Sequence, residues 1–200
     1  AGTWATAFNP TVDASGDCAF AAGLASVASG QVSTAIGWGA EASVTWRANN
    51  MAAGYGARAS GRFALALGNG TLAYGNMSLA FGIDTNAAEQ YCAPMGISNG
   101  CFGEKCVMYG EANECTIASH DSLVGGYGCY STSYGGWAVG VGATAHPDYS
   151  YAIGNGVTTT VESQMAISRL RVEHTSFRHS CWRSSHRPTY GPTPKPTPAP

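Results

Sequence analysis

Apolar and polar positions repeat along the chain in units of seven residues, with a small central residue and a glycine at the end of most units. These glycines are Gly23, Gly30, Gly37, Gly54, Gly61, Gly68, Gly75, Gly82, Gly96, Gly103, Gly110, Gly125, Gly140 and Gly154. Three slips interrupt the register: three extra residues near Thr45–Ala48, and one extra residue in each of the stretches that end at Gly125 and Gly140. Glycine and β-branched residues disfavour helix, so each unit predicts a short strand closed by a glycine turn.

Two such strands make a coil of fourteen residues, and the two strands carry different outer side chains. In one strand, the positions on either side of the central residue are mostly large and apolar. In the other strand they are mostly polar, as at Glu41 and Arg58, with Leu72 and Tyr74 as an apolar exception. We expect the apolar column to be an oligomer interface formed by Phe20, Ile36, Met51, Leu65, Leu67, Leu79, Phe81, Met95, Val107, Tyr109, Trp137, Val139, Tyr151, Ile153, Met165 and Ile167.

The central residues of both strands should point the opposite way and fill the inside of a flat roll. They are mostly alanines: Ala28, Ala35, Ala42, Ala52, Ala59, Ala66, Ala73, Ala80, Ala138 and Ala152. About ten coils at about 4.8 Å each would make an apolar strip roughly 50 Å long, which is more than a soluble monomer exposes. The strip therefore predicts burial against other chains; the alternative is a wider cross-section that encloses it as the monomer's own core.

Composition is consistent with a thin, weakly charged extracellular structure. Charged residues make up 11% of the chain, against roughly 25% in ordinary soluble domains, although the apolar content is 44%. The seven cysteines favour an oxidising compartment, and their odd number leaves at least one without an intrachain partner. No run of 18 apolar residues occurs, so we expect no membrane insertion and a secreted protein.

The repeats resemble the YadA-like head repeats of trimeric autotransporter adhesins over about residues 17 to 168. The segments that carry the resemblance are Phe63–Gly68, Leu79–Gly82 and Tyr151–Gly156. The resemblance implies an all-β fold, a left-handed parallel β-roll, and three rolls packed side by side through their apolar faces. Similar repeats also occur in viral and phage fibre segments, so the resemblance is specific for the fold and not for a ligand.

These features divide the chain into four segments. Residues 1–16 are expected to be an irregular N-terminal arm that could pair at the edge of a neighbouring subunit. Residues 17–168 are the roll, and residues 169–189 form a basic and aromatic connector. Residues 190–200 alternate proline with other residues and predict a polyproline II tail.

Four cysteines lie one coil apart in pairs, Cys92 with Cys106 and Cys101 with Cys115. Residues one coil apart lie about 4.8 Å apart, within the Cα range of a disulfide, so stacked bridges are predicted. The alternatives are that these cysteines replace alanine as small apolar residues, or that they pair across the roll. Cys129 is out of register and should face outward, which leaves it with the remaining cysteines for pairing between subunits. Those are Cys18 and Cys181.

Two sequons, at Asn69 and Asn76, follow glycines and are predicted N-glycosylation sites at exposed corners of one coil. The tail resembles hydroxyproline-rich, O-glycosylated segments. Its candidate positions are Pro192, Thr193, Pro194, Pro196, Thr197 and Pro198.

No residue pattern points to catalysis, a cofactor or a metal. His120, Asp121 and Ser122 are the residue types of a hydrolase triad, but neighbours in sequence rarely reach its geometry, and a polar bulge at a register slip is the simpler interpretation. The basic connector is expected to dock on a neighbouring subunit rather than on nucleic acid. We therefore predict a structural subunit of a secreted fibre that associates with itself and carries covalent glycans. The alternative is an adhesin head that binds a glycan or matrix protein on its polar face.

Overall fold

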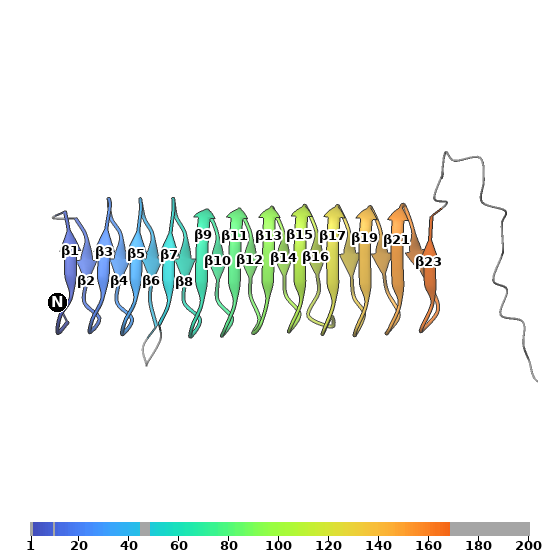
Figure 1. Cartoon of the computed structure of the whole chain (residues 1–200), viewed down its shortest axis with the longest axis horizontal. Helices are drawn as coiled ribbons and strands as arrows, with labels where there is room; N and C mark the ends of the chain where they lie inside the picture. Colours follow the sequence, from blue (N-terminus) through green and yellow to red (C-terminus); the bar gives the residue numbers. More distant parts are fainter. Residues whose placement is uncertain (1, 10, 45–48, 169–200) are drawn as a thin grey trace, which may run out of the picture. The chain divides into compact units, whose positions relative to one another are not determined.

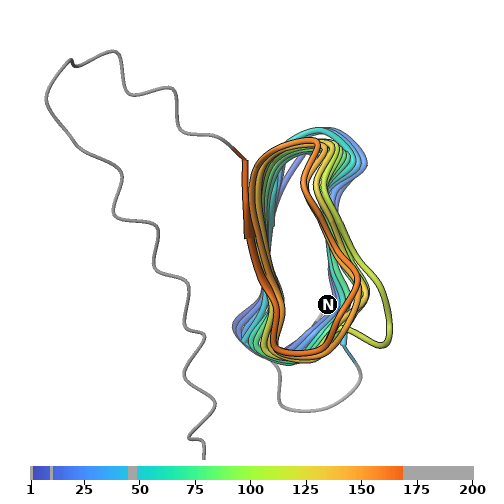
Figure 2. The same cartoon turned by 90° about the vertical axis from the view of Figure 1, so that its right-hand side faces the viewer.

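The computed structural model describes residues 2–9, 11–44 and 49–168, and these form a parallel β-solenoid with no helix (Figure 1). Strands alternate between two sheets along the chain, one of 12 strands and one of 11. Viewed along the axis, the coils lie over one another as a flattened loop (Figure 2). The predicted fold class, an all-β solenoid with coils of about 14 residues, is confirmed.

The first sheet contains the odd-numbered strands. They are β1 (Thr6–Phe8), β3 (Phe20–Ala22), β5 (Thr34–Ile36), β7 (Met51–Ala53), β9 (Leu65–Asn69), β11 (Leu79–Ile83), β13 (Ala93–Ile97), β15 (Val107–Glu111), β17 (Leu123–Tyr127), β19 (Trp137–Val141), β21 (Tyr151–Asn155) and β23 (Met165–Ile167).

The second sheet contains the even-numbered strands, which are two residues long. They are β2 (Asp13–Ala14), β4 (Val27–Ala28), β6 (Glu41–Ala42), β8 (Arg58–Ala59), β10 (Leu72–Ala73), β12 (Asn86–Ala87), β14 (Gly100–Cys101), β16 (Glu114–Cys115), β18 (Tyr130–Ser131), β20 (Thr144–Ala145) and β22 (Thr158–Thr159).

Alanine fills most of the interior, as predicted. All ten of the predicted inward alanines are fully shielded from solvent, each with 0% of its surface exposed. Ala66 lies directly beside Ala80 in the ladder between β9 and β11, so identical side chains stack along the axis. A methyl group is large enough to exclude water between the two sheets, and the larger side chains of Met108 and Val124 in the same column are also fully buried.

Two asparagines supply a polar part of the interior. The Nδ2 of Asn113 donates to the carbonyl oxygens of Tyr109 and Gly126, both at 3.0 Å. Its Oδ1 accepts from the backbone N–H of Cys129 in the next coil at 2.9 Å. The Oδ1 of Asn99 accepts in the same way from the N–H of Asn113 at 2.9 Å. Each buried amide therefore satisfies its own groups and links its coil to the one above.

From β3 to β21, one glycine in each coil occupies a position where an added side chain would be strained; in the first coil Asn9 holds this position, with φ +102°. Gly82 has φ +130°, and a Cβ on it would collide with the carbonyl oxygen of Gly96 in the next coil. The same arrangement repeats at its partners in the ladder, which are Gly68 and Gly96. The periodic glycine thus permits both the backbone conformation and the close stacking of the coils.

The structure changes our placement of the later register slips. Thr34 pairs with Met51, seventeen residues on, which agrees with the three extra residues predicted before β7. Gly110 pairs with Gly126, sixteen residues on, and Gly126 pairs with Gly140, fourteen residues on. The prediction of one extra residue in each of two stretches is therefore wrong, because both lie in one turn between β16 and β17. An exposed turn accommodates them without disturbing either ladder.

The roll begins earlier than we expected. Strands β1 and β2 lie within the segment assigned to an irregular arm, and Thr6 pairs in register with Phe20. Residues 6–14 therefore contribute the first coil. The predicted connector at 169–189 and the tail at 190–200 lie outside the described residues.

Gly82→Ala tests the stacking constraint. The change imposes both an unfavourable φ and a collision with backbone, so we expect it to lower the free energy of unfolding by about 3 kcal/mol or more. Gly142→Ala is the matched control, because Gly142 also has positive φ, at +61°, but nothing lies within 4 Å of an added Cβ. Its cost should be about 1 kcal/mol. Thermal unfolding followed by circular dichroism measures both, and equal losses would contradict the stacking argument.

Candidate self-association face

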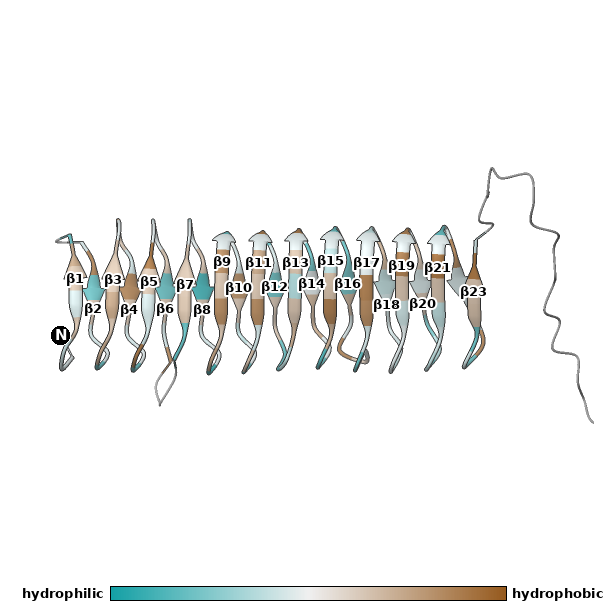
Figure 3. Ribbon diagram, viewed as in Figure 1, coloured by the Kyte–Doolittle hydropathy of each residue, from teal (hydrophilic) through white to brown (hydrophobic). Residues whose placement is uncertain are grey.

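Many outward side chains of the first sheet are large, apolar and exposed. In β11, Leu79 and Phe81 point outward while Ala80 between them is buried, and Phe81 is 53% exposed. Strands β9, β11, β15 and β17 are brown over part of their length in Figure 3, which colours inward and outward residues alike. Successive side chains of a strand point to opposite faces of the sheet, so alanine points inward and the large side chains point outward.

The predicted interface residues all lie on the odd-numbered strands of this sheet, and none of them is buried. This result excludes the alternative in which the column forms the monomer's own core. The core is on the other side of the sheet and contains the alanines.

A further outward column borders the predicted ones and was missed. Its members follow the ladder glycine directly, at Leu24, Trp38, Tyr55, Ile83, Ile97, Tyr127 and Val141. Trp38 is 58% exposed and Tyr127 is 56% exposed. We ended each strand at its glycine, whereas strands β9 to β21 in this sheet continue for one residue beyond it. The signal was an apolar residue directly after the glycine. We call the predicted interface residues and this column together the apolar face.

Aromatic rings on the apolar face pack on one another from coil to coil. Trp38 and Tyr55 lie 5.4 Å apart between ring centroids, and Trp137 and Tyr151 also lie 5.4 Å apart. Gly125 occupies an outward position opposite Tyr109, and a Cβ on it would meet the Tyr109 ring. The Tyr109 ring therefore lies over Gly125. The apolar face is thus covered by an aromatic ring at the position where glycine has no side chain.

The outer face of the second sheet is different. Glu41 and Arg58, on adjacent strands, form an ion pair at 3.2 Å. The hydroxyl of Thr132 lies 3.0 Å from Nδ1 of His146. Beside these polar pairs lie Leu72 and Tyr74, the predicted exceptions. This polar face can stay in water without a partner.

The two sequon asparagines are exposed, on different corners of the coil. Asn69 ends β9 and lies in the outer column of the apolar face, between Tyr55 and Ile83. Asn76 lies on the opposite corner, where its Oδ1 accepts from the Arg62 N–H at 3.0 Å. The hydroxyl residues of both sequons, at Thr71 and Ser78, are buried. Their burial means that a glycan has to be attached before the coil closes.

The cysteines lie mostly inside the roll, and one prediction about them is wrong. Cys129 is 1% exposed rather than outward-facing, because the two extra residues in one turn return it to the inward column of Asn113. Cys18 is exposed, and Cys181 lies outside the described residues. The cysteines at 92, 101, 106 and 115 are buried thiols, so the predicted stacked bridges stay a prediction.

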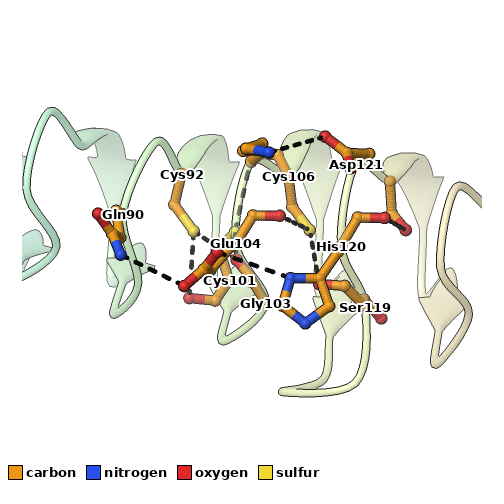
Figure 4. Close-up of polar contacts among 11 residues, drawn as sticks. Gln90, Cys92, Cys101, Gly103, Glu104, Cys106, Ser119, His120 and Asp121 are labelled. Atoms are coloured by element: carbon orange, nitrogen blue, oxygen red, sulfur yellow. Dashed lines mark hydrogen bonds and ion pairs between the residues drawn. The ribbon is translucent and has the colours of Figure 1, made fainter.

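His120, Asp121 and Ser122 do not come together as a triad. Figure 4 shows His120 beside Glu104, with Nδ1 3.8 Å from the carboxylate, and Asp121 pairs with Lys105 at 3.9 Å. The Ser122 hydroxyl is buried and donates to the Ser133 carbonyl at 2.8 Å. Asp121 also hydrogen-bonds Tyr134, which raises the pKa of that phenol. The cluster is a row of surface side chains joined from coil to coil.

The described residues contain no cluster of histidine, cysteine or acidic side chains arranged to hold a metal ion. No helix long and apolar enough to span a bilayer occurs in residues 2–9, 11–44 or 49–168.

Comparison with known families gives one match. Residues 14–40 and 51–71 match the YadA head domain repeat, in two copies. These two stretches therefore resemble YadA-type head repeats, in agreement with the resemblance in the sequence and with the parallel β-solenoid. The match ends at residue 71, whereas the same coil continues in the structure to β23. A search of curated proteins found no match.

Proposed function

We propose that this chain is a structural, self-associating segment of an extracellular fibre, assembled as a homotrimer through its apolar face. The observation that carries the proposal is the row of large, exposed apolar side chains along the first sheet, outside a complete alanine core. Twelve strands at about 4.8 Å, with an outer width of about 15 Å, give a face of about 860 Å². That is close to the roughly 800 Å² that each partner contributes to a standard stable interface.

The charge distribution supports a second copy of the same face as the partner. Glu111 is the only charged residue in the described strands of the first sheet, whereas the shorter strands of the second sheet carry Asp13, Glu41, Arg58 and Glu114. Identical faces can therefore approach one another with little desolvation of charge.

The family match agrees with this assignment. YadA head repeats belong to an adhesin and structural family rather than to enzymes, and YadA-type proteins form homotrimers on the cell surface. Growth into a fibre would follow if the last coil of one copy continued the ladders of the first coil of the next, because all strands are parallel and in register. Covalent glycans at Asn69 or Asn76 and on the proline-rich tail are part of the proposal.

A second candidate is an adhesin head that binds a glycan or a matrix protein. The polar outer face of the second sheet favours it, because its ion pair at Glu41 and Arg58 and its hydroxyl pairs remain accessible when the apolar face is covered. Filaments in electron micrographs of the purified chain would support the fibre, and discrete trimers with saturable ligand binding would support the head.

Charge on the apolar face should abolish self-association. We expect the double substitution Leu65→Asp and Leu79→Asp to convert the oligomer to monomer in sedimentation velocity, because burying either carboxylate is strongly unfavourable. Leu72→Asp is the matched control, since Leu72 is also a half-buried outward leucine but belongs to the second sheet. It should leave the oligomer intact. Circular dichroism confirms folding, and equal sedimentation of the double variant and the wild type would refute the assigned face.

The two sequons should affect assembly differently. After expression in a eukaryotic secretory host, we expect Asn69→Gln and Asn76→Gln each to remove one glycosidase-sensitive mass increment. Only Asn69→Gln should shift the equilibrium toward the oligomer, because a glycan there stands in the outer column of the apolar face. Intact mass and sedimentation velocity measure the two effects. An increase with Asn76→Gln as well would contradict the placement of the face.

A further inference from the structure

Four buried thiols meet inside the roll, at the turns that join the second sheet back to the first. Cys92, Cys101, Cys106 and Cys115 are each 0% exposed. The Cys92 thiol lies 3.9 Å from the Cys101 carbonyl oxygen, and the Cys101 thiol lies 3.8 Å from the Cys106 carbonyl oxygen. Figure 4 shows Cys92, Cys101 and Cys106 projecting into this region. The four cysteines lie in neighbouring coils, so the possible pairings of their sulfur atoms have to be compared by geometry.

Stacked pairs have unfavourable geometry for a disulfide. Cys101 and Cys115 are direct neighbours in register on β14 and β16, and their side chains point the same way. Their Cβ atoms therefore repeat the strand spacing of about 4.8 Å, whereas a disulfide requires roughly 3.5–4.5 Å. The same holds for Cys92 and Cys106, which precede the paired residues Ala93 and Val107.

Pairs across one coil have better geometry. The register places Cys92 and Cys106 in the inward column of Ser150, and Cys101 and Cys115 in that of Thr159. The hydroxyl oxygens of Ser150 and Thr159, nine residues apart, lie 2.9 Å from each other. The γ atoms at these two positions thus meet across the interior. Cys92 and Cys101 are also nine residues apart, as are Cys106 and Cys115.

The third pairing, Cys101 with Cys106, uses only two of the four sulfurs. It would leave Cys92 and Cys115 more than one and a half coils apart, or about 8 Å along the axis, which is beyond the reach of a disulfide. Only the pairs across one coil combine all four cysteines with acceptable spacing.

We propose that Cys92–Cys101 and Cys106–Cys115 form two disulfides, each of which closes one coil across its interior. In each step two thiols lose two protons and two electrons as the S–S bond forms. A disulfide oxidant, such as oxidised glutathione, accepts them and is cleaved to two thiols. Because the four side chains are shielded in the closed roll, oxidation takes place as the coils form.

Fragment mapping tests the pairing on the full chain carrying Cys129→Ala, refolded with reduced and oxidised glutathione. Free thiols are alkylated in denaturant, and the chain is cleaved with cyanogen bromide at Met95 and Met108 and with trypsin at Lys105. Each of the four cysteines then lies in a separate fragment. We expect the fragment ending at Met95 to be linked to residues 96–105, and residues 106–108 to be linked to the fragment that follows Met108. Stacked links, a Cys101–Cys106 link, or alkylation of all four would overturn the proposal.

Paired variants give a second measurement. Cys92→Ala should release one alkylatable thiol, located at Cys101, whereas the double variant C92A/C101A should release none. C92A/C106A should release two, at Cys101 and Cys115. Alanine occupies the same columns in earlier coils, at Ala64 and Ala87, so these variants should fold, which circular dichroism checks. If C92A/C101A instead released two thiols, at Cys106 and Cys115, the stacked pairing would be correct and the proposal would be overturned.

Discussion

The constraint on which the structure depends is the backbone ladder that joins each coil to the next. It fixes the spacing along both sheets at about 4.8 Å, so each residue lies directly on its equivalent one coil away. A position that is favourable in one coil has to be favourable in every coil, which explains the repeats of alanine and glycine. Gly82 shows how strict this is, because a single added Cβ would collide with the next coil.

The same ladder determines what the surface presents. Most inward positions hold alanine, and the alternation along each strand places large apolar side chains such as Leu79 and Phe81 outside. Their burial then depends on another chain, and stability and self-association become linked. The polar second sheet needs no such partner, because side chains such as Glu41 and Arg58 pair with each other.

The sequence correctly predicted the elements that follow the fourteen-residue repeat. The predictions failed where the position of the repeat glycine, and hence the register, was ambiguous. Leu65, Ala66 and Leu67 gave the direction of a whole column, because each coil repeats the pattern. Gly125 and Gly126 are adjacent, so spacing alone could not show which belongs to the ladder, and choosing Gly125 placed Cys129 on the wrong side. The column at Ile83 and Tyr127 was missed because a glycine inside a strand was interpreted as its end.

The coils between Cys92 and Ser131 depart from the alanine rule in every inward column at once. Met108 and Val124 replace alanine in the first sheet, Asn99 and Asn113 occupy one corner, and cysteines occupy the other corner and the second sheet. The two extra residues lie in the same region, in a turn between β16 and β17. Side chains larger than alanine are nevertheless fully buried here, and both ladders continue in register through these coils. Asn113 links its coil to the one above through its amide, and the proposed disulfides would add covalent links within the same region.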